Sequence, residues 1–180
     1  VCSSDLLPDT VPADNFISSL TFNNGLLYAS GRGTNDGDTM FLVDPCDCTA
    51  TVVGSYGFTM VAGITSNGAQ DMFGISGGDD VIFSINPASA LGTLLSALGS
   101  DWGTVGLTWS GDTRDSLWGI SGSTDELVEF SAQDGSQLSA ITMDFDFSSV
   151  GVEYHPGVDT IYACSGSGEL LTVNPSTGKV

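Results

Sequence analysis

Short runs of apolar residues alternate with clusters of Gly, Asp, Ser and Asn along most of the chain. Regular spacing of such runs is typical of an all-β fold, and no apolar pattern of helical period persists for more than about two turns. One string recurs as LLYAS, MFGIS, LWGIS and IYACS at 26–30, 72–76, 117–121 and 161–165. Its aromatic member falls at Tyr28, Phe73, Trp118 and Tyr162, and we expect these rings to pack in the core between neighbouring sheets.

Two further landmarks keep the same spacing. SSLT, AGIT, VGLT and VGVE precede the aromatic string, and FLVDP, FSINP, VEFSA and LTVNP follow it. A period of roughly 44 residues built from short strands is typical of β-propeller blades. We therefore predict an all-β β-propeller with about four antiparallel four-stranded blades. The blades are expected at 17–60, 61–104, 105–149 and 150–180, the last of them incomplete.

The apolar runs also predict the individual strands. They fall at 18–22, 26–30, 40–44, 50–54, 61–66, 71–76, 81–86, 92–97, 105–110, 116–121, 127–131, 137–142, 150–154, 160–164 and 169–173. The first strand of each blade carries a small residue in register: Ser19, Gly63, Gly106 and Gly151. A missing side chain lets inner strands converge closely on a propeller axis, although glycines also mark β-bulges.

The turn between the third and fourth strands reads DPCDCT, NPASAL, SAQDGS and NPSTGK. Asx-Pro-x-x-Gly favours a type I turn followed by a left-handed residue. In the first repeat Cys48 occupies the glycine position, and we expect a local disulfide with Cys46. Reduced thiols, or half of a zinc site that lacks its other ligands, are the alternatives. Cys164 is in register with Ile75 and Ile120, which predicts a buried, inert side chain.

The charge of the chain is strongly negative. Twenty-two acidic residues face three basic ones, for a formal net charge of −19. Such a surface repels phosphate backbones and anionic lipid, so we expect neither nucleic-acid binding nor binding to a membrane surface. No apolar run approaches the roughly 18 residues that span a bilayer, so membrane insertion is not expected either. Cations, basic proteins or neutral glycans are the expected partners, and the charge also serves solubility.

The two ends of the sequence have distinctive features. Residues 1–6, VCSSDL, read as a translated sequencing adapter and are expected to be non-native, with 7–16 forming a loop from a preceding blade. NPSTGKV stops where the other repeats enter their last strand. Pro8 and Pro12 argue against a strand at 7–16 that would close a four-bladed ring. An internal fragment of a larger ring is therefore expected.

The strings VGLTW, LWGIS, FSINP, NPSTGK and TATVVG resemble the blades of secreted bacterial β-propeller repeat proteins of the WD40/YVTN-like type. The resemblance runs through 17–180, and the third repeat departs from it at SAQDG, which keeps only Gly135. It implies a ring of about six to eight blades on a secreted, periplasmic or cell-surface protein. It carries over no catalytic motif.

One loop face is the first candidate for ligand binding. The loops from second to third strand and from blade to blade share this face and combine carboxylates with aromatic rings. The candidate contacts are Trp102, Phe145, Asp36, Asp38, Asp144 and Asp146. Oxygen ligands at Asn35, Asp36 and Asp38 also suggest calcium, although the loop lacks the terminal glutamate of an EF-hand. Solvated turn acids are the simpler interpretation of these residues.

Catalysis has little support in the sequence, and no catalytic residue is assigned. His155 is the only histidine, and Asp112, Arg114 and Asp115 lie in the equivalent loop of the preceding blade. The sequence thus favours a non-enzymatic extracellular binding or scaffold module, with no cofactor beyond possible use of calcium. The alternative is part of a propeller enzyme, a quinone-dependent dehydrogenase or a lactonase-like hydrolase, with metal on the axis. Glu153 is the one ionisable residue at the inner-strand positions.

Overall fold

The computed structural model describes residues 17–31, 38–47, 49–99, 101–103, 105–111, 114–148 and 150–180. Within these ranges all regular secondary structure is β, so no helix there could span a bilayer. Four separate antiparallel sheets follow one another along the chain, and in each of them the strands are ordered as in the sequence. This arrangement confirms the predicted all-β propeller.

Each predicted strand is present, with bounds that agree to within one residue. The first sheet holds β1 (Ile17–Asn23), β2 (Leu26–Gly31), β3 (Thr39–Asp44) and β4 (Thr49–Ser55). The second holds β5 (Val61–Ser66), β6 (Met72–Ser76), β7 (Val81–Ile85) and β8 (Gly92–Ala97). The third holds β9 (Val105–Trp109), β10 (Ser116–Ser121), β11 (Glu126–Ser131) and β12 (Gln137–Thr142). The fourth holds β13 (Val150–His155), β14 (Thr160–Ser165) and β15 (Leu170–Val173).

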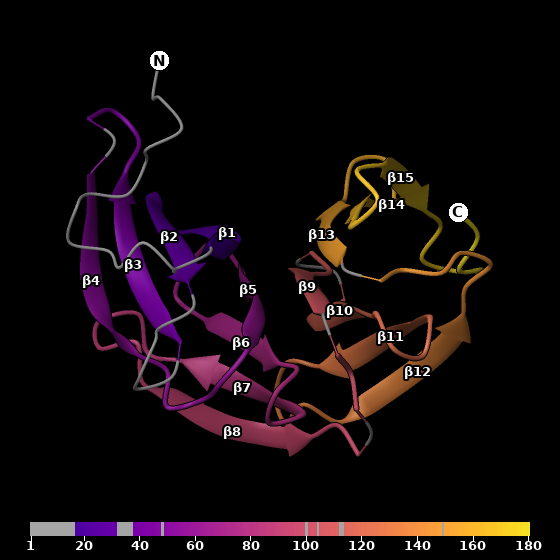
Figure 1. The fold of residues 1–180 in the computed structure, drawn as a ribbon, viewed down its shortest axis with the longest axis horizontal. Helices are drawn as coiled ribbons and strands as arrows, with labels where there is room; N and C mark the ends of the chain where they lie inside the picture. Colours follow the sequence, from indigo (N-terminus) through magenta and orange to yellow (C-terminus); the bar gives the residue numbers. More distant parts are fainter. Residues whose placement is uncertain are drawn as a thin grey trace.

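The four sheets follow an arc around a common centre, with the first and fourth sheets at its two ends (Figure 1). The first strands of successive sheets contact one another, β1 with β5, β5 with β9, and β9 with β13. They are therefore the inner strands of the blades. Each later strand in a sheet lies farther from the centre, as in a propeller.

Three apolar cores fill the spaces between successive sheets. Tyr28 packs between the first and second sheets, Phe73 between the second and third, and Trp118 between the third and fourth. All three rings are buried, as predicted. Tyr162 has the same register but is 38% exposed, so its expected burial is wrong. The reason is that no sheet among the described residues covers this face of the fourth blade.

Cys164 lies on the same face as Tyr162 and is also exposed. It pairs with Gly151 across the sheet, just as the buried Ile120 pairs with Gly106. The predicted register therefore holds, whereas the predicted burial of the thiol is wrong. Cys46 is exposed in the β3–β4 turn, and its expected disulfide partner Cys48 lies outside the described residues, so that pairing stays a prediction.

The glycines of the inner strands allow close contact between blades. A Cβ atom on Gly63 would lie 2.8 Å from the backbone nitrogen of Leu107, and one on Gly106 would lie 3.1 Å from that of Val152. Gly151 has open space around the same position. Two neighbouring blades thus explain the first two glycines, which confirms the packing interpretation at these positions.

Hydroxyl groups join the inner strands across the blade boundaries. Ser19 Oγ accepts a hydrogen bond from Ile64 N at 3.0 Å. Thr65 Oγ1 accepts from Trp109 N, and Thr108 Oγ1 from Tyr154 N, both at 2.9 Å. The inner edge of each blade is therefore bonded to the next by a side chain, since adjacent sheets share no β-ladder.

The turns after the third strands close in the predicted manner. Ala90, Gly135 and Gly178 have positive φ of 64°, 70° and 67°. The amide of each donates to the carbonyl four residues earlier, at 2.8, 2.9 and 2.8 Å. The equivalent turn of the first blade contains Cys48, which lies outside the described residues.

Candidate functional site

Trp102 was expected on a ligand-binding face, and the structure places it in the core. Its side chain is 3% exposed, and its ring lies 5.4 Å from that of Phe130 between the second and third sheets. Phe145 is half-buried beside Phe147, with ring centroids 4.7 Å apart. Neither ring stands free on the surface, so ligand contact through them stays a prediction.

Three aspartates of the same face have a repeated structural role. Asp38, Asp80 and Asp125 each come directly before the third strand of their blade. Their carboxylates accept backbone N–H groups from the following blade-to-blade connection. The donors are Val61, Trp102 at 2.9 Å and Phe147 at 3.1 Å. These acids therefore hold the connection to the next blade in place. Of the three, Asp38 was predicted as a ligand contact.

The remaining predicted contacts are dispersed. Asp144 and Asp146 are exposed, and Asp144 Oδ1 accepts a hydrogen bond from Val180 N at 3.0 Å. Asn35 and Asp36 lie outside the described residues, so the calcium hypothesis stays a prediction. Among the described residues no three acidic, histidine or cysteine side chains form a group that would hold a metal ion.

The polar residues near His155 also have other partners. Arg114 Nη2 lies 3.8 Å from Asp159 Oδ1, and its guanidinium lies 5.7 Å from the centre of the Trp118 ring. His155 is exposed and meets the edge of Tyr162. Asp112 lies outside the described residues. The acid–base cluster considered for these loops has no support in the described contacts.

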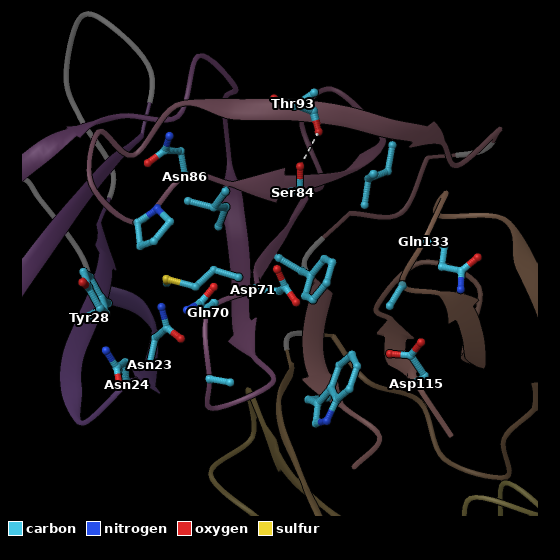
Figure 2. Close-up of a pocket in the computed structure, with 18 of the residues that line it drawn as sticks. Asn23, Asn24, Tyr28, Gln70, Asp71, Ser84, Asn86, Thr93, Asp115 and Gln133 are labelled. Carbon is cyan, nitrogen blue, oxygen red and sulfur yellow. Dashed lines mark hydrogen bonds between the residues drawn. The ribbon is translucent and has the colours of Figure 1, made fainter. Parts of the chain in front are cut away.

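A large groove opens on the opposite face of the propeller, where first strands turn into second strands and third into fourth. Its volume is about 830 Å³, and it extends from the first blade across the second to the third. Figure 2 shows its polar side chains, which come from turns and from the neighbouring strands. They are Asn23, Asn24, Tyr28, Gln70, Asp71, Ser84, Asn86, Thr93, Asp115 and Gln133.

Some of these groups are fixed by the fold and others remain available. Asn23 Oδ1 accepts from Ser66 Oγ at 2.9 Å, and Asp71 Oδ2 accepts from Asn67 Nδ2 at 2.8 Å. Gln70 and Gln133 are exposed at separate places on the groove wall. Phe73 and Trp109 stack in parallel on its apolar side, with centroids 6.0 Å apart. The groove combines fixed amides and carboxylates with free amides and the partly buried ring of Trp109.

Sequence reasoning missed this groove. Its polar residues sit in turns such as NNG at 23–25 and AQD at 69–71, where turn chemistry already accounts for them. A repeat comparison also hides them, because each blade contributes a different residue. No signal in one sequence would have separated Gln70 or Gln133 from ordinary turn residues.

The fold and this site define the chain as a β-propeller with a polar groove on one face. No protein-family model matches the sequence, and no characterised protein matches it by sequence. Several solved structures share the fold. A glutaminyl cyclase from Myxococcus xanthus superposes with a TM-score of 0.69 at 16% identity, over 93% of this chain and 69% of that one.

Two further structures are similar to the same degree. A chain of a nidogen/laminin complex has a TM-score of 0.67 at 12% identity, over 90% of this chain and 62% of its own length. A luciferin-regenerating enzyme has a TM-score of 0.64 at 15% identity, over 87% of this chain and 56% of its own length. This chain thus spans between 56% and 69% of these proteins. Identities this low show the fold alone, and the similar proteins include both enzymes and a binding partner.

Proposed function

We propose that the protein is a non-enzymatic extracellular binding module that holds a neutral glycan in the groove across its first three blades. The composition of the groove carries this proposal. Amide and carboxylate groups bond to sugar hydroxyls, and aromatic surface packs against the apolar faces of sugar rings. The groove supplies both kinds of group within about 830 Å³, a volume that suits a small ligand or a short oligosaccharide.

The charge of the groove favours a neutral or cationic ligand. Asp71 and Asp115 line it, and no lysine or arginine is among its described lining residues. The whole chain has a formal charge of −19. An anionic polymer would be repelled at long range and would find no basic partner in the groove. This supports a neutral glycan over nucleic acid or a sulfated or phosphorylated ligand.

An extracellular location is part of the proposal and rests on the resemblance of the blade sequences. The exposed carboxylates Asp101, Asp144 and Asp146 on the opposite face provide a second surface, which a protein partner would contact. The enzymatic alternative draws on Glu153, the only acidic side chain that the described inner strands contribute. A single carboxylate gives weak support for an enzymatic reaction. The composition of the groove gives stronger support for ligand binding.

A glycan array tests the proposal on the full chain. We expect binding to one class of neutral glycan, and the double substitution Gln70→Ala/Gln133→Ala should weaken it at least about tenfold, because two hydrogen-bonding groups are lost. Gln137→Ala is the matched control, since Gln137 is exposed but does not line the groove. Binding that both variants retain equally would place the glycan elsewhere. Absence of binding to every neutral glycan would overturn the proposal.

A further inference from the structure

A second cavity, of about 500 Å³, lies at the centre of the arc. We call it the central cavity, because all four inner strands line it. β1 contributes Leu20 and Phe22, β5 contributes Thr65, β9 contributes Trp109, and β13 contributes Glu153 and Tyr154. Its lining differs from that of the polar groove, since most of it is apolar or aromatic and only Trp109 lines both.

Glu153 is the one carboxylate among the described residues that line the central cavity, and no lysine, arginine or histidine lines it there. The three preceding blades have Thr21, Thr65 and Thr108 at the equivalent position, so the carboxylate is specific to the fourth blade. Its side chain remains accessible from the cavity. Burial by the surrounding walls raises its pKa, and a hydrogen bond from Thr108 Oγ1 to Oε2, at 3.4 Å, opposes that shift. The carboxylate is exposed to the cavity and has no cationic partner among the described lining residues.

Aromatic side chains from three blades line the same cavity as this carboxylate. Phe22 stands on the first sheet, Trp109 on the third and Tyr154 on the fourth, and all three line the central cavity. Tyr154 is held at both ends. Its backbone N–H bonds to Thr108, and its hydroxyl donates to Asp159 Oδ1 at 2.8 Å. The ring is therefore fixed before any ligand arrives, which lowers the entropic cost of binding.

We propose that the central cavity binds a small organic cation, with its ammonium group beside Glu153 and its carbon atoms against Phe22, Trp109 and Tyr154. A carboxylate without a basic partner attracts a cation, and aromatic faces add a favourable cation–π interaction. An uncharged ligand would leave the carboxylate without its partner. The net charge of the chain further raises the local concentration of cations. This proposal does not depend on glycan binding in the groove.

Titration calorimetry that compares choline with dimethylbutanol tests the proposal. Dimethylbutanol has the shape of choline, with an uncharged carbon in place of the ammonium nitrogen. We expect choline to bind the full chain and dimethylbutanol to bind at least about tenfold more weakly, because only the cation pairs with the carboxylate. Glu153→Gln should remove the preference for choline. Glu126→Gln also removes one negative charge, but outside the central cavity, and this variant should keep the preference for choline. Circular dichroism of each variant establishes that the fold is intact.

A second variant addresses the aromatic wall without touching the charge. Phe22 is largely exposed, so Phe22→Ala should fold normally and weaken choline binding about three- to tenfold, as expected for one cation–π contact. Any one of three results would overturn the proposal. The first is that choline does not bind, and the second is that choline and dimethylbutanol bind equally well. The third is that Glu153→Gln and Glu126→Gln weaken choline binding to the same extent.

Discussion

The carboxylate of Asp80 accepts a hydrogen bond from the backbone N–H of Trp102, at 2.9 Å, across the 22 residues that lead from the second blade into the third. The backbone carbonyl of Asp80 also accepts from Leu98 N at 2.8 Å. One residue thus holds both ends of the connection between blades. Because Asp38 and Asp125 make the equivalent bonds, the same device recurs at each described blade boundary.

Removing the Asp80 carboxylate should destabilise the fold. Asp80→Ala leaves the buried N–H of Trp102 without an acceptor and places alanine at a φ of 50°, so we expect a loss of about 2 kcal/mol in the free energy of unfolding. Asp80→Asn keeps a hydrogen-bond acceptor, and asparagine tolerates this φ, so the loss in the free energy of unfolding should be much smaller. Denaturant unfolding followed by tryptophan fluorescence measures both.

Asp146→Ala is the control for the Asp80 substitutions. Asp146 is an exposed aspartate of the same face, and its loss should change stability by less than about 0.5 kcal/mol. If Asp80→Ala were no more destabilising than Asp146→Ala, Asp80 would have no role in joining the blades.

The inner-strand glycines provide a test of blade packing. Alanine at Gly63 or Gly106 would push against the backbone of the next blade, and we expect each substitution to cost about 1–3 kcal/mol through overpacking. Gly151→Ala has the same register but open space, and it should be neutral or slightly stabilising. Thermal unfolding of the three variants gives the comparison. Equal losses at all three positions would show that strand propensity, and not contact between blades, governs these sites.

The fold could be predicted because it depends on a local pattern that repeats. Apolar runs separated by turn residues define each strand, and the recurrence of Tyr28, Phe73 and Trp118 defines the blades. Burial was less predictable, as Tyr162 shows. A side chain on the face of a blade is buried only by the next blade, so its exposure depends on residues far away in the sequence.

The site was harder to predict, for a related reason. Trp102 was predicted on an exposed loop face, and only the folded chain brings its N–H to the Asp80 carboxylate and its ring into the core. Glu153 was visible as an exception in a row of threonines. The walls of its cavity come from all four blades, however, and their shape is not encoded in any one repeat.

Thr108 should stabilise the boundary between the third and fourth blades. Its side chain is buried, and its hydroxyl accepts from Tyr154 N and donates to Glu153. Thr108→Val keeps the shape but leaves a buried N–H without a partner, so we expect a loss of about 1–2 kcal/mol. Thr108→Ser keeps the hydroxyl and should retain most of the stability that Thr108→Val loses. Thr51→Val, at an exposed position on β4, controls for the general effect of the substitution, and unfolding in urea provides the measurement.

The raised pKa of Glu153 predicts a dependence of stability on pH. Burial makes the folded protein hold this proton to higher pH than the unfolded chain does, where the ordinary value is 4.5. The folded state therefore binds more protons in this range, and stability falls as pH rises from that value through the raised pKa. Glu153→Gln removes the charged form and should melt at a higher temperature than the parent protein at neutral pH.

The gain in melting temperature of Glu153→Gln should disappear in acid, because the Glu153 carboxyl of the parent protein is then protonated in both the folded and the unfolded state. Melting temperatures between about pH 3 and about pH 8 measure the difference across the titration. His155 on the same strand and the Arg114–Asp159 pair on the neighbouring loops are the same in both proteins. Glu126→Gln controls for the general relief of repulsion in a chain of charge −19. A gain that is independent of pH, or equal in the control, would contradict a raised pKa of the Glu153 carboxyl.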